Sequence, residues 1–326
     1  MEKLEGKRLF HTMNKLGRQN VPFVFLVDAW AEHGFIIPVH EAEQWLLFDL
    51  NGKNNHIVHT NTPELVSWNI FPVEYSDYEK GFNLAMDHIR RGDSFLLNYT
   101  QPTRIESNLS LLELFQLGKA RYKVHLKGCF TCFSPEIFVT VDEHGKISSH
   151  PMKGTMPATS PDAEERILHN RKEIAEHHTI VDLIRNDLSK VALQVEVDKF
   201  RYTERLETNR LPLLQVSSEI SGILPAGWKD MIGDIFRELL PAGSVTGAPK
   251  HMTMEIIRKA EGYDRNWYTG IIGIFDGTTV DSGVLIRYIE EIDGSLYFKS
   301  GGGITYQSQC RDEYNEMISK VYVPVA

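Results

Sequence analysis

Cysteine is scarce in this chain of 326 residues, which contains only three. Proteins of oxidising compartments often depend on paired cysteines, so a low and odd count argues against a disulfide framework and favours a reducing compartment. Cys129 and Cys132 form a C-x-x-C pair, but no second pair follows that would complete a zinc site. We therefore interpret them as thiols of a strand, in preference to a zinc or redox site.

The sequence also lacks a long apolar run, a signal peptide and an excess of positive charge. Its longest apolar stretch, residues 21–39, is interrupted by Asp28, Glu32 and His33, which disfavours a membrane span. The N-terminus has no apolar core of the kind that signal peptides carry. A formal net charge of −9 disfavours binding to nucleic acid or to anionic membranes. We expect a cytoplasmic protein that binds neither, and that holds any anion with local donors.

Strand signals are present in two regions, residues 130–149 and residues 267–304. In the first, residues 142–145 have the composition of a turn. In the second, Asp-Gly pairs at 276–277 and 293–294 each separate two strand-like runs. Asp-Gly at such a place is a strong hairpin signal, so neighbouring strands are predicted to be antiparallel. This argues against a doubly wound nucleotide-binding fold, which requires helical crossovers.

Helix signals are equally clear. Ser160 and Pro161 are typical of a helix start, and the apolar periodicity then predicts one helix to about Leu188. A mixture of helices and antiparallel strands indicates the α+β class. Without an evident linker we expect one domain, with a short N-terminal portion (1–75) and a core (76–326). Further helices are predicted near the N-terminus and over 78–91, 250–261 and 311–321.

Two predicted helices carry candidate metal ligands. Glu176 lies at the edge of an apolar face, which is an unfavourable place for a carboxylate without a partner. Glu313, Glu316 and Lys320 share one face of the last helix. Such a trio is usually a solvated, salt-bridged surface, but the apolar neighbours leave little of this helix free. We nominate Glu176 and Glu316 as ligands of a hard cation, since Mg²⁺ binds one or two protein carboxylates.

Two glycine-containing stretches and one arginine are further candidates. The stretch PAGSVTGAPK (241–250) precedes a helix and is either an anion-binding loop or a tight turn; it lacks the spacing of a Walker loop. The stretch SGGGI (300–304) is either a bend or a place where a ligand meets backbone. Arg287 lies amid aliphatic residues in a strand signal, and a buried arginine needs an anion, either a structural carboxylate or a substrate.

The stretch HPMKGTMP (150–157) surrounds Lys153 with small or rigid residues. By itself it permits a solvated turn, an anion ligand or a nucleophile. Together with IVDLIRNDL (180–188), PAGSVTGAPK, GGGI and the closing Glu-x-x-Glu with Lys320, it resembles chorismate-utilising enzymes over residues 77–321.

The resemblance implies a single α+β domain of two antiparallel β-sheets packed face to face, with helices on the outside. It implies one Mg²⁺, held by Glu176 and Glu316, that binds the ring carboxylate of chorismate. Glu136 resembles the general acid of the family. The residues that resemble substrate contacts are Gly154, Thr155, Thr246, Tyr268, Arg287, Gly301, Gly303 and Lys320.

Lys153 distinguishes two branches of the family, because anthranilate-forming members carry alanine there. The lysine resembles that of the branch that makes 4-amino-4-deoxychorismate, a precursor of p-aminobenzoate and folate. There the amine attacks ring carbon C2 and expels the 4-hydroxyl, and ammonia then attacks C4 and expels the lysine. A nucleophilic lysine must have a lowered pKa. We favour this role over a purely electrostatic one, and an anthranilate synthase-like enzyme is the close alternative.

Three departures from the family pattern refine this hypothesis. Gln215 stands where many members have histidine, and Leu96 stands where water-adding members have lysine, which disfavours isochorismate formation. The portion before about Ser76 is short, so we expect no tryptophan feedback. The sequence shows no glutaminase region, which implies ammonia from solution or from a separate glutamine amidotransferase subunit. A pyridoxal enzyme using Lys153 and a non-catalytic anion-binding protein remain rival interpretations.

Overall fold

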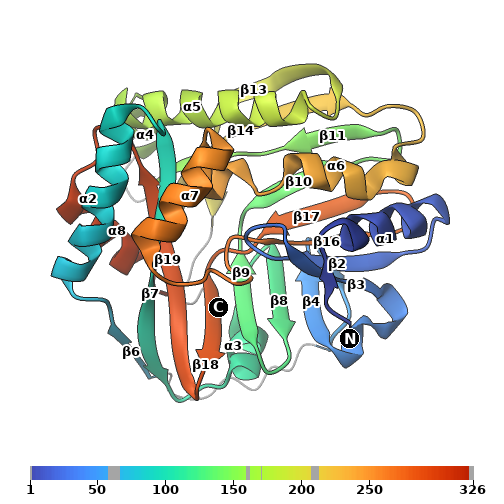
Figure 1. Cartoon of the computed structure of the whole chain (residues 1–326), viewed down its shortest axis with the longest axis horizontal. Helices are drawn as coiled ribbons and strands as arrows, with labels where there is room; N and C mark the ends of the chain where they lie inside the picture. The colour runs from blue at the N-terminus through green and yellow to red at the C-terminus, as the bar shows by residue number, and fades with distance from the viewer. Residues whose placement is uncertain (1, 58–66, 159–161, 170, 207–212, 323–326) are drawn as a thin grey trace.

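Two antiparallel sheets make up most of the computed structural model, which describes residues 2–57, 67–158, 162–169, 171–206 and 213–322 (Figure 1). Within these residues, sheet A has ten strands in the order β1-β3-β2-β16-β17-β10-β11-β14-β12, with β13 also pairing β14. Its strands are β1 (Leu4–Glu5), β2 (Phe23–Val27), β3 (His33–Pro38), β10 (Ile137–Val141), β11 (Lys146–Ser149), β12 (Met152–Pro157), β13 (Leu193–Leu206), β14 (Leu213–Ile223), β16 (Ile271–Phe275) and β17 (Val280–Val284).

Sheet B has nine strands within the same described ranges, in the order β15-β7-β19-β18-β9-β8-β4-β5, with β6 also pairing β7. Its strands are β4 (Leu46–Leu50), β5 (Lys53–Asn54), β6 (Trp68–Phe71), β7 (Leu96–Ser107), β8 (Tyr122–Leu126), β9 (Phe130–Ser134), β15 (Gly247–Ala248), β18 (Tyr288–Ile292) and β19 (Ser295–Ile304).

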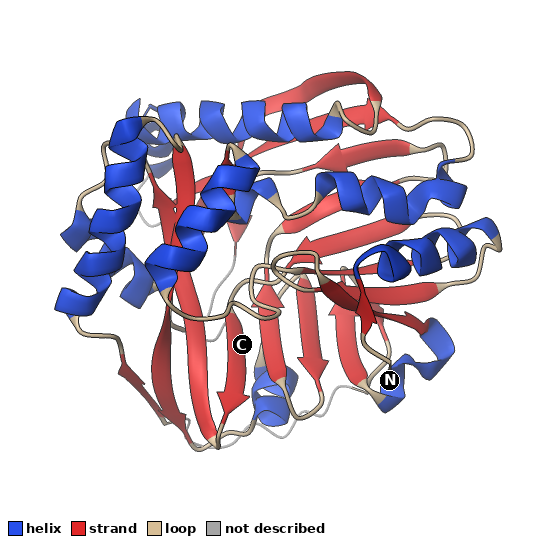
Figure 2. Cartoon of the chain, in the orientation of Figure 1, coloured by secondary structure: helices blue, strands red, loops and turns tan. Residues whose placement is uncertain are grey.

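Helices cover the sheets on their outer sides (Figure 2). Helices α1, α5 and α6 pack on sheet A, whereas α2, α7 and α8 gather beside β7 and β19 of sheet B. The helices are α1 (Gly6–Arg18), α2 (Tyr75–Arg91), α3 (Leu111–Leu117), α4 (Ala163–His169), α5 (Arg171–Leu188), α6 (Ile232–Leu239), α7 (Lys250–Glu261) and α8 (Cys310–Ser319), with 3-10 turns η1 (Val39–Gln44), η2 (Trp228–Met231) and η3 (Gly243–Val245).

The core between the two sheets joins apolar side chains from both. Val24 and Ile272 from sheet A belong to the same buried cluster as Phe48 and Val124 from sheet B. Burial of such aliphatic and aromatic surface is the main stabilising term of a domain of this kind. The expected single α+β domain with two packed antiparallel sheets is therefore confirmed.

The turn chemistry anticipated in the sequence is confirmed. The Asp-Gly pairs at 276–277 and 293–294 lie between β16 and β17 and between β18 and β19, and both pairs of strands are antiparallel. Helix α7 has the expected bounds and ends at Gly262, whose φ of 68° is the left-handed conformation that suits glycine. Local chemistry alone therefore predicts these elements.

One structural expectation is met in its described part and another needs correction. The helix predicted up to Leu188 is present as α4 and α5 on either side of residue 170; that residue, like Ser160 and Pro161, lies outside the described residues, so the continuity of the helix stays a prediction. Of the C-x-x-C pair, only Cys132 lies in a strand, because Cys129 belongs to the turn before β9. Both thiols are free, and burial raises the pKa of Cys132 far above its usual range.

None of the helices in the described part of the chain is both long and apolar enough to cross a membrane.

Candidate active site

Two charged side chains of α8, and that of the lysine directly after the helix, converge on the glycine-rich end of β19. A Cβ atom added at Gly302 would lie 3.3 Å from Glu316 Oε1, 3.5 Å from Glu313 Oε2 and 3.7 Å from Lys320 Nζ. Glu313 is buried, although it sits in the first turn of the helix. The face that was predicted from helical spacing therefore lies over backbone of sheet B and is not simply a solvated surface.

Lys320 connects this face to the strand beneath it. Its ammonium group forms an ion pair of 2.7 Å with Glu316 and donates a hydrogen bond of 2.7 Å to the carbonyl of Gly301. Gly301 itself has no room for a side chain, because an added Cβ would lie 2.1 Å from the carbonyl oxygen of Tyr99 on β7. The glycines thus allow close approach of two strands directly below a charged cluster.

Arg287 does not occupy the expected place in a buried strand. It lies in the bend between β17 and β18, is only half-buried and has a φ of 54°. Its guanidinium donates to the carbonyl of Lys320 over 3.2 Å and lies 4.8 Å from the ring centre of Tyr322. The aliphatic residues directly before it, Leu285 and Ile286, lie in the connection between the two strands, so the aliphatic run that suggested a strand extends past the end of β17. Arg287 remains next to Lys320, another candidate substrate contact.

Glu136 precedes β10 and contacts the PAGSVTGAPK stretch. Its carboxylate accepts a hydrogen bond from the hydroxyl of Ser244. Thr246, two residues further on, is buried, and its hydroxyl donates to the carbonyl of Ala242 over 2.8 Å. The stretch therefore forms a tight, internally bonded turn that also presents a hydroxyl to the candidate general acid.

Lys250 anchors this turn to α5. Its ammonium group forms an ion pair of 2.7 Å with Asp187 and donates to the carbonyl of Leu239 over 2.7 Å. Gly243 lies against the same helix, because an added Cβ would be 3.0 Å from Asp187 Oδ2. The IVDLIRNDL and PAGSVTGAPK motifs thus meet through a buried ion pair, and Lys250 has a structural partner within the protein.

Arg265, which the sequence analysis did not single out, is fully buried, whereas Arg287 is not. Its guanidinium donates twice to Glu261, over 2.8 and 2.6 Å, and once each to the carbonyls of Val245 and Asn98, over 2.8 and 2.6 Å. It also donates to Thr269 Oγ1 over 3.2 Å. Every N–H group of the guanidinium therefore has an acceptor within the protein.

The partner of Arg265 is held just as closely. One oxygen of Glu261 accepts hydrogen bonds from the backbone N–H and from the hydroxyl of Thr100, over 2.8 and 2.6 Å. Thr100 is the strand partner of Gly301. The pair therefore fixes the neighbours of three candidate substrate contacts: Thr246, Tyr268 and Gly301. No local sequence signal marks Arg265, because its partners come from four separate segments.

The strand that carries Lys153 lies at the edge of sheet A. Strand β12 pairs with β14, with Met152 opposite Ser217 and Thr155 opposite Gln215, and Gly154 between them has a φ of 87°. The side chains of Lys153 and Thr155 lie outside the described part of the structure. The amide of Gln215 contacts the sulfur of Met152, so the position where relatives have histidine adjoins the neighbour of Lys153.

The comparisons with known proteins support one family. The family model of chorismate binding enzymes matches residues 38–326. An uncharacterised PabA-like protein of Haemophilus influenzae is 48% identical over 96% of this chain and 95% of its own length. Aminodeoxychorismate synthase component 1 of Escherichia coli is 32% identical over 75% of this chain and 56% of its own length.

The chain belongs to the chorismate-binding enzymes.

A solved structure described as MenF, the menaquinone-specific isochorismate synthase of Escherichia coli, shares the fold. It superposes with a TM-score of 0.76 over 98% of this chain and 82% of its own, at 15% identity. At that identity the likeness concerns the fold alone. The two sheets described above are therefore the architecture of a chorismate-binding enzyme.

In this chorismate-binding enzyme, the α8 face has the donor chemistry of a site for a hard cation. The carboxylate oxygens of Glu313 and Glu316 face one spot above Gly302, and carboxylates are the ligands that Mg²⁺ takes. Glu176, the other nominated ligand, is half-buried on α5, next to His177, whose Nε2 lies 2.7 Å from Ser218 Oγ. Within the described residues no group of three metal-ligating side chains is preformed. The two carboxylates above Gly302 have the chemistry that Mg²⁺ requires, and the ion itself stays a prediction.

Tyr268 and Gly303 complete the set of expected substrate contacts of the chorismate-binding enzyme. Tyr268 is buried, and burial raises the pKa of its phenol well above the usual range, so the hydroxyl stays protonated. Gly303 lies in β19 opposite Asn98 of β7, whose carbonyl is held by Arg265. Both residues are thus positioned by elements that the Arg265–Glu261 pair joins.

Proposed function

We propose that the protein converts chorismate and ammonia into 4-amino-4-deoxychorismate, in the cytoplasm, on the route to p-aminobenzoate and folate. The observation that carries this proposal is a lysine in the PMKGT stretch of a chorismate-binding enzyme, on strand β12 of the sheet that also contains β10, which Glu136 precedes. The 32% identity to aminodeoxychorismate synthase component 1 of Escherichia coli supports the same reaction.

In the proposed reaction Lys153 is the nucleophile. Its neutral amine forms a bond to C2 of the ring, both ring double bonds shift, and the C4–O bond breaks. Glu136 gives its proton to the departing hydroxyl, which leaves as water. Ammonia then bonds to C4, the C2–nitrogen bond to Lys153 breaks, and one proton of the new ammonium group returns to Glu136, which restores the enzyme to its starting state. The bond from Ser244 holds the Glu136 side chain in one orientation between turnovers.

The remaining candidate residues bind the two carboxylates of chorismate. Arg287 and Lys320 would hold the enolpyruvyl carboxylate, since both carry positive charge next to each other. Glu176 and Glu316 would hold Mg²⁺, and Glu313 is a third carboxylate at that place. A bound Mg²⁺ supplies the positive charge that neutralises the ring carboxylate.

We further propose that a separate glutamine amidotransferase subunit supplies the ammonia in the cell. The sequence contains three cysteines and no region that resembles a glutaminase. Cys132 is buried, and its pKa is raised, so it does not serve as a thiolate nucleophile.

The experiment is to incubate the purified protein with chorismate, Mg²⁺ and ammonium chloride, and to identify the products by chromatography and mass spectrometry. We expect 4-amino-4-deoxychorismate, which an added lyase converts to p-aminobenzoate. Anthranilate formed without any lyase would instead establish the alternative, an anthranilate synthase-like enzyme. Unchanged chorismate would contradict both.

A further inference from the structure

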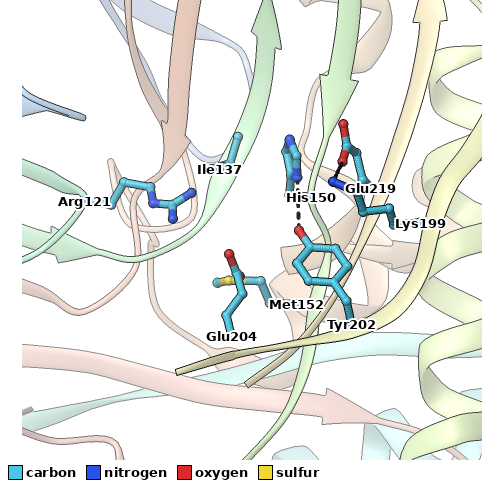
Figure 3. A pocket seen from close by; sticks show the side chains of 8 residues that line it. All are labelled: Arg121, Ile137, His150, Met152, Lys199, Tyr202, Glu204 and Glu219. Carbon is cyan, nitrogen blue, oxygen red and sulfur yellow. Dashed lines mark hydrogen bonds and ion pairs between the residues drawn. The ribbon is translucent and has the colours of Figure 1, made fainter. Parts of the chain in front are cut away.

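A polar pocket of about 250 Å³ lies beside β12, the strand that carries Lys153 and is called the catalytic strand below (Figure 3). The pocket has no role in the proposed site. Pockets for drug-sized ligands are usually about 300–1,000 Å³, so this one suits a small occupant. Its lining residues are Arg121, Ile137, His150, Met152, Lys199, Tyr202, Glu204 and Glu219.

The pocket is lined by the neighbours in the chain of both candidate catalytic residues. Ile137 directly follows Glu136, and Met152 directly precedes Lys153. The strand register extends this link, because Glu204 pairs with Gln215, which pairs in turn with Thr155. The register therefore places the backbone of Thr155 and that of the pocket residue Glu204 on opposite sides of Gln215 in β14.

The charges of the pocket are not equally available to an occupant. The ammonium group of Lys199 forms an ion pair of 3.0 Å with Glu219. Glu204 is half-buried, and its carboxylate accepts a hydrogen bond of 2.9 Å from the hydroxyl of the buried Ser217. Arg121 is exposed, so water screens its charge. An occupant of the pocket thus meets the negative charge of Glu204.

Two further groups can accept hydrogen bonds there. His150 Nδ1 lies 3.4 Å from the hydroxyl of Tyr202, and both side chains face the pocket (Figure 3). Burial lowers the pKa of His150 by more than the nearby carboxylate of Glu219 raises it, so the imidazole stays neutral at physiological pH. Burial raises the pKa of Tyr202, so its phenol stays neutral too. A carboxylate, a phenol oxygen and a neutral imidazole together suit a small cation with several N–H donors.

We propose that this pocket binds ammonium and is the place where the nitrogen substrate reaches the catalytic strand. The proposal rests on the proposed function, in which ammonia is the second substrate. Glu204 supplies the charge, and Tyr202 and His150 supply the further acceptors. We assign the pocket the binding step only; the proton that ammonium must lose leaves to water.

The test is steady-state kinetics with ammonium chloride as the varied substrate, at saturating chorismate and Mg²⁺. Glu204→Gln keeps the size of the side chain and removes its charge. We expect it to raise the KM for ammonium about tenfold while leaving the KM for chorismate unchanged. Tyr202→Phe, which removes one acceptor, should raise the ammonium KM by a smaller factor. The melting temperature of each variant reports whether it folds.

Glu196→Gln is the matched control. Glu196 lies on the same strand, and its partner Ser221 shares a face with Gln215, but it does not line the pocket. We expect the wild-type KM for ammonium in this variant. Aminated product from the wild type together with an unchanged ammonium KM in Glu204→Gln and Tyr202→Phe would overturn the pocket assignment alone. No aminated product from the wild type would overturn the proposed function and the pocket assignment together.

Discussion

Arg265 and Glu261 form an ion pair of 2.6 Å in which the side chains are 1% and 0% exposed. The pair ties together β7, the turn before α7 and the segment that leads into β16. A buried pair contributes little net stability over an apolar core, but the loss of one partner leaves the other charge without compensation. The pair therefore fixes the positions of the segments around the site, and removal of either partner should lower the free energy of unfolding strongly.

Glu261→Gln should accordingly destabilise the fold by about 3–5 kcal/mol. The amide keeps the shape but leaves the guanidinium of Arg265 buried without a counter-charge. Urea unfolding monitored by circular dichroism measures the change. As a control, Asp77→Asn removes one partner of the exposed Asp77–Lys80 pair and should shift stability by less than about 1 kcal/mol. Equal effects of the two substitutions would contradict the role assigned to the buried pair.

Lys153→Ala should lower ammonia-dependent turnover more than about 100-fold, because it removes the nucleophile and with it the covalent route. The melting temperature should stay near that of the wild type, since β12 is an edge strand of sheet A. Product formation and thermal unfolding are the two measurements. Lys146→Ala, on the neighbouring part of the same sheet, is the control and should retain wild-type turnover. Substantial activity in Lys153→Ala would rule out the covalent mechanism.

Glu313→Gln and Glu316→Gln should each raise the Mg²⁺ concentration for half-maximal activity at least about tenfold, because both carboxylates face the spot above Gly302. Calorimetric titration of Mg²⁺ into the protein with bound chorismate measures the same change without turnover. Asp312→Asn removes an exposed carboxylate from the same helix and serves as the control. If Glu313→Gln titrates like the wild type, only Glu316 belongs to the cation site on α8.

His125 should make the fold less stable in mild acid. Burial lowers its pKa from 6.5 to about 4 in the folded protein, so the unfolded chain binds a proton first. The contribution of neutral His125 to the free energy of unfolding is therefore fully present above about pH 6.5. It is lost as the pH falls toward 4, by roughly 3 kcal/mol at most.

Urea unfolding at a series of pH values between 7 and 4 measures this loss. In His125→Leu the slope of stability against pH should become shallower over that window. His144→Leu, which changes an exposed histidine, should keep the wild-type slope. An unchanged slope in His125→Leu would assign the acid sensitivity to other groups.

Local features of the chain could be predicted from its sequence because their causes are local. The bounds of α7 follow from its periodicity and from Gly262, and the hairpins of sheets A and B follow from two Asp-Gly pairs. The motif residues of α8 were correctly placed on one face, since helical spacing alone decides that.

Long-range features could not be predicted in this way. Arg287 was expected to be buried and is half-buried, whereas Arg265 is fully buried through partners up to 167 residues away. Glu313 was grouped with Glu316, but its burial against sheet B depends on how α8 docks. The pairing of β12 with β14 likewise depends on contacts distant in sequence. Such contacts leave no periodic signal in the segments that make them.

The position of β2 limits how the chain can be shortened. All five of its residues pair with β16, near the middle of sheet A, although the two strands are separated by more than 240 residues of sequence. Removal of the first 75 residues would leave β16 as an unprotected edge with open backbone donors and acceptors, a surface that invites strand addition by another copy. A minimal catalytic fragment of this enzyme should therefore keep its opening strands, or cover that edge by other means.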